Sequence, residues 1–158
     1  MVRALLAALL LTMAPAAVAQ PAGVPRPTAP LTWLTGSWRG AGTMMGNASE
    51  ASLTVRPALG GRFFEFSYRA GPFEGRAFYR PVNGAWQATW FDNRGVTFPI
   101  AATHDGRTLT SDWGSEQTER GRTVYRLAED GRLHLIDSVR RPDGSYREFA
   151  NHVLTRAE

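Results

Sequence analysis

The sequence predicts an all-β fold, a closed antiparallel up-and-down β-barrel of about ten strands. After Ser37, short runs of β-branched and aromatic residues are separated by turn residues at intervals close to 8 to 12 residues, the spacing typical of sandwiches and barrels. Several runs alternate between apolar and polar residues, which gives each strand one inward face. We expect closure because an open meander of this length leaves two unpaired edges.

The N-terminal part of the chain is expected to precede the barrel. Residues 1–19 have the pattern of a signal peptide, with Arg3, an apolar run over 4–13 and small residues before the cleavage point. The run is shorter than the roughly 20 residues of a membrane-spanning helix, so we expect cleavage, a periplasmic or secreted protein, and no membrane span in the mature chain. Residues 20–30 carry four prolines and predict an extended leader, followed by one barrel domain over 31–158.

Composition excludes several classes of function. The chain has no cysteine, which excludes disulfides and thiolate chemistry and leaves stability to the core. All 18 basic residues are arginine, the net charge is +4, and the arginines alternate with acidic residues along the chain. Nucleic acid is therefore not an expected partner.

The predicted elements follow one another in a regular order. Leu31, Trp33 and Leu34 form one apolar side of a short helical turn that ends at Gly36 and covers one end of the barrel. The strands are expected at 37–45, 51–57, 62–69, 75–81, 85–92, 96–103, 108–113, 122–128, 132–140 and 146–155. Turns are expected at pairs that tolerate positive φ: Gly60-Gly61, Gly71-Pro72, Asn83-Gly84, Asn93 to Gly95, Asp105-Gly106, Arg120-Gly121, Asp130-Gly131 and Asp143-Gly144.

The first strand carries the most distinctive motif, Leu34-Thr-Gly36-Ser-Trp38-Arg-Gly40-Ala-Gly42. Its glycines permit a bent and closely packed strand, and Trp38 is expected to close the barrel beneath the interior. The glycine spacing after Gly40 does not fit a dinucleotide-binding loop and no helix follows, which excludes nucleotide binding there. The motif therefore predicts architecture rather than chemistry.

This motif resembles the opening of nitrobindin-type barrels, which have a lipocalin-like (calycin) fold. Four later segments are similar to an exported bacterial family of unknown function with the same fold: Leu59-Gly-Gly-Arg-Phe-Phe-Glu-Phe66, Gly71-Pro-Phe-Glu-Gly75, Ala88-Thr-Trp-Phe-Asp92 and Asp105-Gly-Arg-Thr-Leu-Thr110. Together the similarities cover nearly all of 31–156. They imply a lipocalin-like barrel and assign it no substrate.

The resemblance also implies a candidate metal site. Nitrobindin-type barrels bind heme iron through a histidine of the last strand, and His152 lies in the last predicted strand. Heme with His152 as axial ligand is therefore one alternative, and a hydrogen-bonded strand histidine is the other. With three histidines and no cysteine the chain has little material for another metal site, and no cofactor besides heme is expected.

Aromatic residues give the main functional prediction, the binding of a small apolar molecule inside the barrel. Alternation places many aromatic side chains on inward faces, and such a lining with a few polar tips is typical of small-molecule pockets. The alternative is an interior that these side chains fill completely. Arg62, Arg76 and Arg80 are candidate anchors for a ligand carboxylate. The expected lining is Phe64, Phe66, Tyr68, Tyr79, Trp86, Trp90, Phe98 and Trp113.

An enzymatic function is a further alternative, supported by fewer candidate residues. The chain has no Gly-x-Ser-x-Gly elbow and no cysteine nucleophile. Asp137 and Glu148 are the first pair to examine for acid and base chemistry, provided that both point inward. Otherwise each strand carboxylate is expected to meet an arginine of a neighbouring strand.

Overall fold

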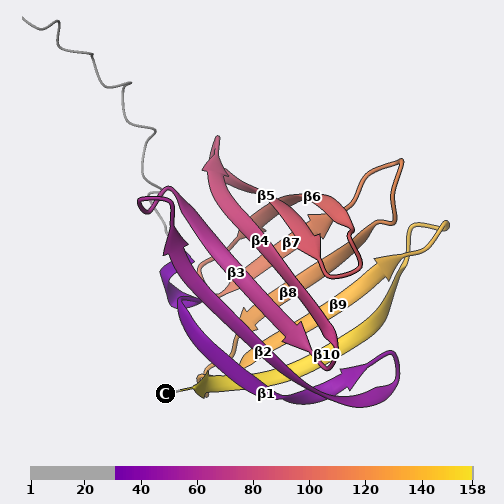
Figure 1. Ribbon diagram of the computed structural model, residues 1–158, viewed down its shortest axis with the longest axis horizontal. Coiled ribbons are helices and arrows are strands. Elements are labelled where there is room, and N and C mark those ends of the chain that lie inside the picture. The colour runs from indigo at the N-terminus through magenta and orange to yellow at the C-terminus, as the bar shows by residue number, and fades with distance from the viewer. Residues whose placement is uncertain (1–30, 158) are drawn as a thin grey trace, which may run out of the picture.

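The computed structural model describes residues 31–157 as a closed barrel of ten antiparallel strands (Figure 1). Each strand pairs with its neighbours in the sequence, and β1 pairs with β10 to close the barrel. The predicted fold class is confirmed, including the short helical turn before the first strand, which is the 3-10 turn η1 (Leu31–Trp33). The predicted signal peptide (1–19) and leader (20–30) lie outside the described residues.

All the expected strands are present, and only the start of β2 differs from its expected position by more than two residues. Met45 and Gly46 both have positive φ, 51° and 79°, and form a two-residue hairpin turn that lets β2 begin at Asn47 rather than at 51. The strands are β1 (Gly36–Met44), β2 (Asn47–Ala58), β3 (Phe63–Ala70), β4 (Phe73–Val82), β5 (Ala85–Asp92), β6 (Thr97–His104), β7 (Thr108–Trp113), β8 (Gly121–Leu127), β9 (Leu133–Arg140) and β10 (Tyr146–Ala157).

The predicted turn at Arg120-Gly121 is wrong. Gly121 is the first residue of β8, and a side chain there would overlap the Trp113 ring and the Ser138 carbonyl oxygen of the flanking strands. The connection between β7 and β8 instead begins at Gly114, whose φ is 90°. Gly121 is therefore needed for close packing within the sheet.

One end of the barrel is closed by η1 and the two strands that meet beside it. Trp38 is fully buried, and its Nε1 donates to the Leu34 carbonyl oxygen at 2.8 Å. The Arg156 guanidinium lies 4.3 Å from the centre of the Trp38 ring and donates to the carbonyl oxygens of Thr35 (2.7 Å) and Trp33 (3.0 Å). Through these contacts of Arg156, the last strand holds η1 in place at this end of the barrel.

The glycines of the first strand let β1 approach β10 closely. A Cβ at Gly40 would overlap the carbonyl oxygen of Val153, and one at Gly42 would overlap that of Asn151. No side chain fits at either position without displacing the backbone of β10. The motif therefore has a direct part in closing the barrel.

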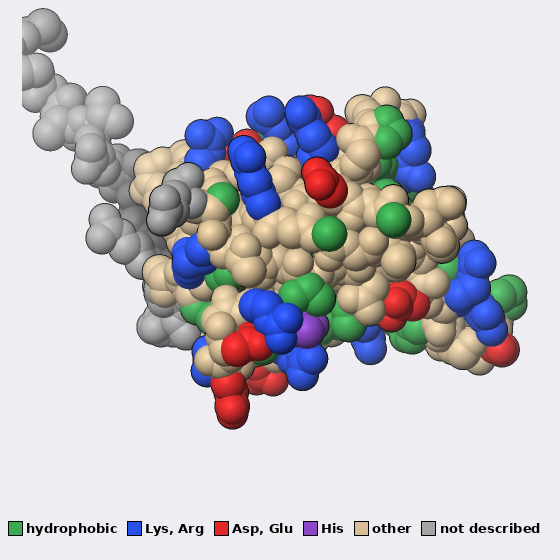
Figure 2. Space-filling view, turned by 90° about the horizontal axis from the view of Figure 1, so that it is seen from below, with side chains coloured by type: hydrophobic (Ala, Val, Ile, Leu, Met, Phe, Trp, Pro, Cys, Tyr) green, Lys and Arg blue, Asp and Glu red, His purple; other side chains and the backbone are tan. Residues whose placement is uncertain are grey.

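Charged side chains of both signs are scattered over the outside of the barrel. Figure 2 shows arginines and acidic residues interspersed on one face of the molecule. Across neighbouring strands Arg56 pairs with Glu65 (2.7 Å) and Arg122 pairs with Asp112 (2.7 Å). Among residues 31–157, no helix has the length and the apolar character needed to cross a bilayer.

Candidate functional site

A cavity of about 220 Å³ lies inside the barrel at the end opposite η1, where β1 ends and β10 begins. This end is on the right of Figure 1, where the β1–β2 and β9–β10 turns lie. Its apolar lining consists of Met44, Met45, Phe73, Trp90, Phe98, Ile100, Trp113, Leu135, Val139 and Phe149. Its polar lining consists of Tyr68, Tyr79, Arg94, Glu119, Thr123, Tyr125, Asp137 and Arg147.

The eight aromatic residues expected to line the interior divide into two groups. Tyr68, Tyr79, Trp90, Phe98 and Trp113 line the cavity. Phe64, Phe66 and Trp86 are buried in the packed core beneath it. In this core Phe64 meets Trp86 edge to face at 5.8 Å. The interior is therefore filled in one part and hollow in the other, and ligand contact by the five lining residues stays a prediction.

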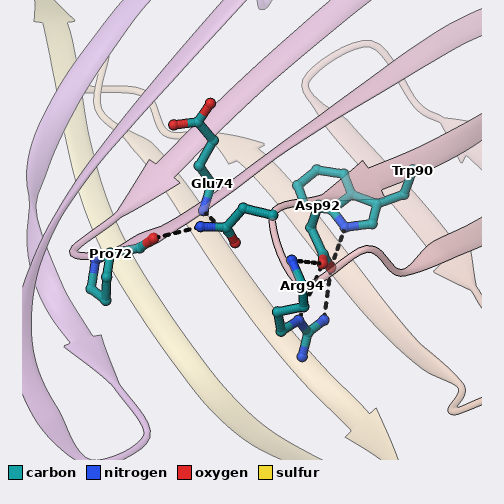
Figure 3. Close-up of polar contacts among 6 residues, drawn as sticks. Pro72, Glu74, Trp90, Asp92 and Arg94 are labelled. Atoms are coloured by element: carbon teal, nitrogen blue, oxygen red, sulfur yellow. Dashed lines mark hydrogen bonds and ion pairs between the residues drawn. The ribbon is translucent and has the colours of Figure 1, made fainter.

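Trp90, Asp92 and Arg94 form a fixed polar cluster at the mouth of the cavity (Figure 3). Trp90 Nε1 donates to Asp92 Oδ2 at 3.1 Å, and Arg94 donates to both carboxylate oxygens at 3.2 and 2.7 Å. The Arg94 guanidinium also lies 5.3 Å from the centre of the Phe73 ring. Burial of the Asp92 carboxyl opposes its ionisation, but the hydrogen bonds from Arg94 and Trp90 outweigh burial and lower its pKa.

Asn93 fixes the same loop to the β3–β4 turn. Its Nδ2 donates to the Pro72 carbonyl oxygen at 2.8 Å, and a dashed line at Pro72 marks this bond in Figure 3. Its backbone N–H donates to the Glu74 carbonyl oxygen at 3.0 Å, and its Oδ1 accepts from the Glu74 backbone at 3.4 Å. Two connections at the mouth are therefore held together, which keeps Arg94 at the rim.

Asp137 lines the cavity from a strand of the barrel wall, whereas Glu119 lies on a connection between strands. Asp137 lies on β9, one inward position deeper than Val139, and its Oδ1 accepts a hydrogen bond from Thr123 Oγ1 at 2.5 Å. None of the ion pairs within residues 31–157 involves Asp137. Burial raises its pKa to about 6, against the opposing effect of the Thr123 hydrogen bond.

Three tyrosines surround Asp137 with neutral hydroxyl groups. Tyr79 Oη lies 3.0 Å from Ser111 Oγ, and burial raises the pKa of Tyr79 to about 12. Burial raises the pKa of Tyr68 and of Tyr125 as well, and the negative charge of Asp137 contributes in the same direction. These groups offer hydrogen bonds to a ligand and carry no charge at neutral pH.

His152 points into the barrel but does not line the cavity. It is fully buried, its Nδ1 lies 3.4 Å from Tyr68 Oη, and its Nε2 has no hydrogen-bond partner. A heme needs space beside that nitrogen, and a cavity of about 220 Å³ is smaller than the roughly 300 to 1,000 Å³ of ordinary ligand pockets. The residues present therefore do not fit a heme held by His152.

The other sequence candidates lie apart from one another. Glu148 is exposed and accepts a hydrogen bond from Asn151 at 3.1 Å, so it does not meet Asp137 inside the barrel. Arg62 and Arg80 are exposed, and Arg76 lies beside Glu65 at 3.4 Å, so none of the three lines the cavity. In the described part of the chain, no group of three or more histidine and acidic side chains is placed to hold a metal ion.

Three charged residues of the site are absent from the sequence prediction. Arg94 and Glu119 lie on connections between strands, and Arg147 lies near the start of β10. The sequence holds a signal for them, because alternate connections of an up-and-down barrel all lie at the same end. Because η1 covers one end of the barrel, the mouth must lie at the opposite end.

A scan against protein-family models gives no match to the chain, and a search of curated proteins gives none either. The closed ten-stranded barrel agrees with the lipocalin-like fold that the sequence resemblance implies. Membership of a particular family stays a prediction.

Proposed function

We propose that this protein is an exported barrel that binds a small, largely apolar molecule in the open end of its interior. One observation carries the proposal: a cavity of about 220 Å³ with predominantly aromatic and aliphatic walls lies above a closely packed core. Apolar walls with a few convergent polar groups are the usual composition of a binding pocket. The signal-peptide pattern of residues 1–19 supports export.

The volume of the cavity limits the size of the ligand. A closed apolar cavity of roughly 150 Å³ holds a benzene molecule. The present cavity, about 220 Å³, therefore has room for one aromatic ring with a few further atoms. A long acyl chain or a tetrapyrrole would need the core below to open.

The walls of the cavity are formed before any ligand arrives. Its lining comes from paired strands, and the mouth is held by the Asp92–Arg94 ion pair and by Asn93. A rigid pocket loses little conformational entropy when a ligand enters. Binding is therefore expected to leave the backbone nearly unchanged.

A variant that fills the cavity tests the proposal. Val139 lines the cavity, whereas Val124 lies between the inward residues of β8 and faces outward, so Val139→Trp and Val124→Trp form a matched pair. We expect benzyl alcohol to shift the indole NMR signals of Trp90 and Trp113 in the original protein and in Val124→Trp. We expect no shift in Val139→Trp.

Two results would contradict cavity binding. One is the absence of any shift in the original protein with benzyl alcohol and with charged ligands of similar size. The other is an equal affinity in the Val139→Trp and Val124→Trp variants, because a ligand bound elsewhere does not respond to a filled cavity.

A further inference from the structure

Asp137 has no ion-pair partner among the described residues, unlike Glu65, Asp92 and Asp112 on other strands. Glu65 lies 2.7 Å from Arg56, Asp92 lies 2.7 Å from Arg94, and Asp112 lies 2.7 Å from Arg122. Within residues 31–157, the one polar contact of Asp137 is the hydrogen bond from the Thr123 hydroxyl. An enclosed carboxylate without a partner costs folding free energy that a cation in the cavity would recover.

The charges around the cavity sum to a negative value. Arg94 is neutralised by Asp92, which leaves Arg147, Glu119 and Asp137 as the other charged groups of the lining. Two carboxylates against one guanidinium give an excess of one negative charge. A cation is therefore favoured in this space, because an anion would meet the excess negative charge.

The walls suit the body of an organic cation. Phe73 and Trp90 stack with ring centres 6.1 Å apart, and Phe98 and Trp113 lie 5.2 Å apart, all four facing the cavity. Aromatic faces attract an ammonium group through their quadrupoles and also pack against an apolar body. A metal ion is less well served, because no group of three or more histidine and acidic side chains is placed to hold one among the described residues.

We propose that the ligand of the cavity is a small organic cation, a protonated amine carried on one aromatic or compact apolar body, with Asp137 as its counter-charge. The amine donates to the Asp137 carboxylate oxygens at the bottom of the cavity while the body lies between the aromatic walls. This assignment rests on the proposed function and names its ligand class.

Three ligands of one shape and different charge test the assignment: benzylamine, benzyl alcohol and benzoate, titrated calorimetrically into the purified protein at pH 7.5. We expect benzylamine to bind at least tenfold more tightly than benzyl alcohol, and benzoate to bind more weakly than both. In Asp137→Asn, which can still accept the Thr123 hydrogen bond, we expect benzylamine to lose its advantage while benzyl alcohol keeps its affinity. Asp112→Asn, on the outer surface, is the matched control and is expected to leave all three affinities unchanged.

The pH dependence of binding gives a second reading of the same contact. Protonation of Asp137 removes its charge, so the affinity for benzylamine is expected to fall between pH 7.5 and pH 5 in the original protein and to stay level in Asp137→Asn. The titratable and charged groups facing this space are common to both proteins, so they cancel in the comparison. They are Tyr68, Tyr79, Arg94, Glu119, Tyr125 and Arg147, with His152 behind Tyr68.

The outcomes separate this assignment from the proposed function. Equal affinities for benzylamine and benzyl alcohol, or an unchanged benzylamine affinity in Asp137→Asn, overturn the cation assignment and leave cavity binding in place. No binding of any of the three ligands overturns both. Because the three ligands are compared first in the unmodified protein, the test holds even where a variant folds poorly.

Discussion

At the level of single residues, burial disfavours the charged forms of Asp137 and His152 in the interior of the barrel. Burial raises the pKa of Asp137 to about 6, so the folded protein holds that proton more tightly than the unfolded chain does. Burial lowers the pKa of His152, so the unfolded chain holds that proton more tightly. Acidification therefore stabilises the fold through Asp137 and destabilises it through His152.

Asp137→Asn should change how stability depends on pH. The destabilisation caused by the ionised carboxylate is fully present above pH 6 and disappears as the pH falls toward the usual aspartate pKa of about 4. We expect Asp137→Asn to be more stable than the original protein at pH 7.5, by up to roughly 3 kcal/mol, and to lose most of this advantage at pH 4.5. Urea unfolding at the two pH values measures the difference, with Asp112→Asn as control. The same advantage at both pH values would contradict the raised pKa.

At the level of strands, close packing between β1 and β10 depends on glycines that leave no room for a side chain. A Cβ at Gly42 would overlap the Asn151 carbonyl oxygen, whereas the neighbouring Ala41 already carries one. The closure of the barrel therefore depends on glycine at defined positions of the first strand.

Gly42→Ala is expected to destabilise the protein by more than about 2 kcal/mol, because the new methyl group has to displace backbone. Ala41→Ser, at the adjacent and less crowded position, should cost less than about 0.5 kcal/mol. Thermal unfolding followed by circular dichroism compares the two. Equal melting temperatures would contradict the prediction, because β10 would then accommodate the new methyl group without loss of stability.

The sequence predicts the strands well because glycine-containing turns and alternating side chains are local signals. These signals do not predict the β1–β2 turn, because Met45 has positive φ at a position where Asn or Asp is usual. The failure of Asp137 and Glu148 to meet has a different origin. A β-bulge between Glu148 and Ala150 shifts the register with β9, so Glu148 no longer shares the inward face of Ala150, His152 and Leu154.

The position of the cavity depends on information that no single strand contains. Phe64, Phe66 and Tyr68 share one inward face, yet only Tyr68 reaches the cavity. Their depth is set by how the whole set of strands is staggered around the barrel. Alternation therefore predicts which side chains point inward, but it does not predict which of them line the cavity.

At the level of the whole molecule, the first and last strands of the barrel are joined where β1 pairs with β10. Trp38 pairs with Arg156 across this join, and the same arginine holds η1 through two backbone carbonyls. Residues far apart in sequence thus complete both the barrel wall and its closed end. Such long-range contacts make unfolding of the barrel a single cooperative event.

Arg156→Ala should weaken this join and lower the stability of the whole barrel. Two hydrogen bonds and the contact with the Trp38 ring are lost together, which is expected to cost about 1 to 2 kcal/mol. Arg132→Ala removes a fully exposed, solvent-screened pair with Asp130 and should cost much less stability than Arg156→Ala. Calorimetry of both variants tests the difference, and one transition is expected in each. Equal losses would mean that Arg156 acts only as a surface charge.

The position of η1 and of the end of β10 also bears on how this protein can be used. Leu31 and Ala157 both lie at the closed end, a barrel length away from the mouth, where β1 ends and β10 begins. A surface linker or a fluorescent reporter attached beside either residue therefore stands clear of the opening. Barrels immobilised in this way would all present the open end to the solution, as the sensing layer of a detector for small molecules requires.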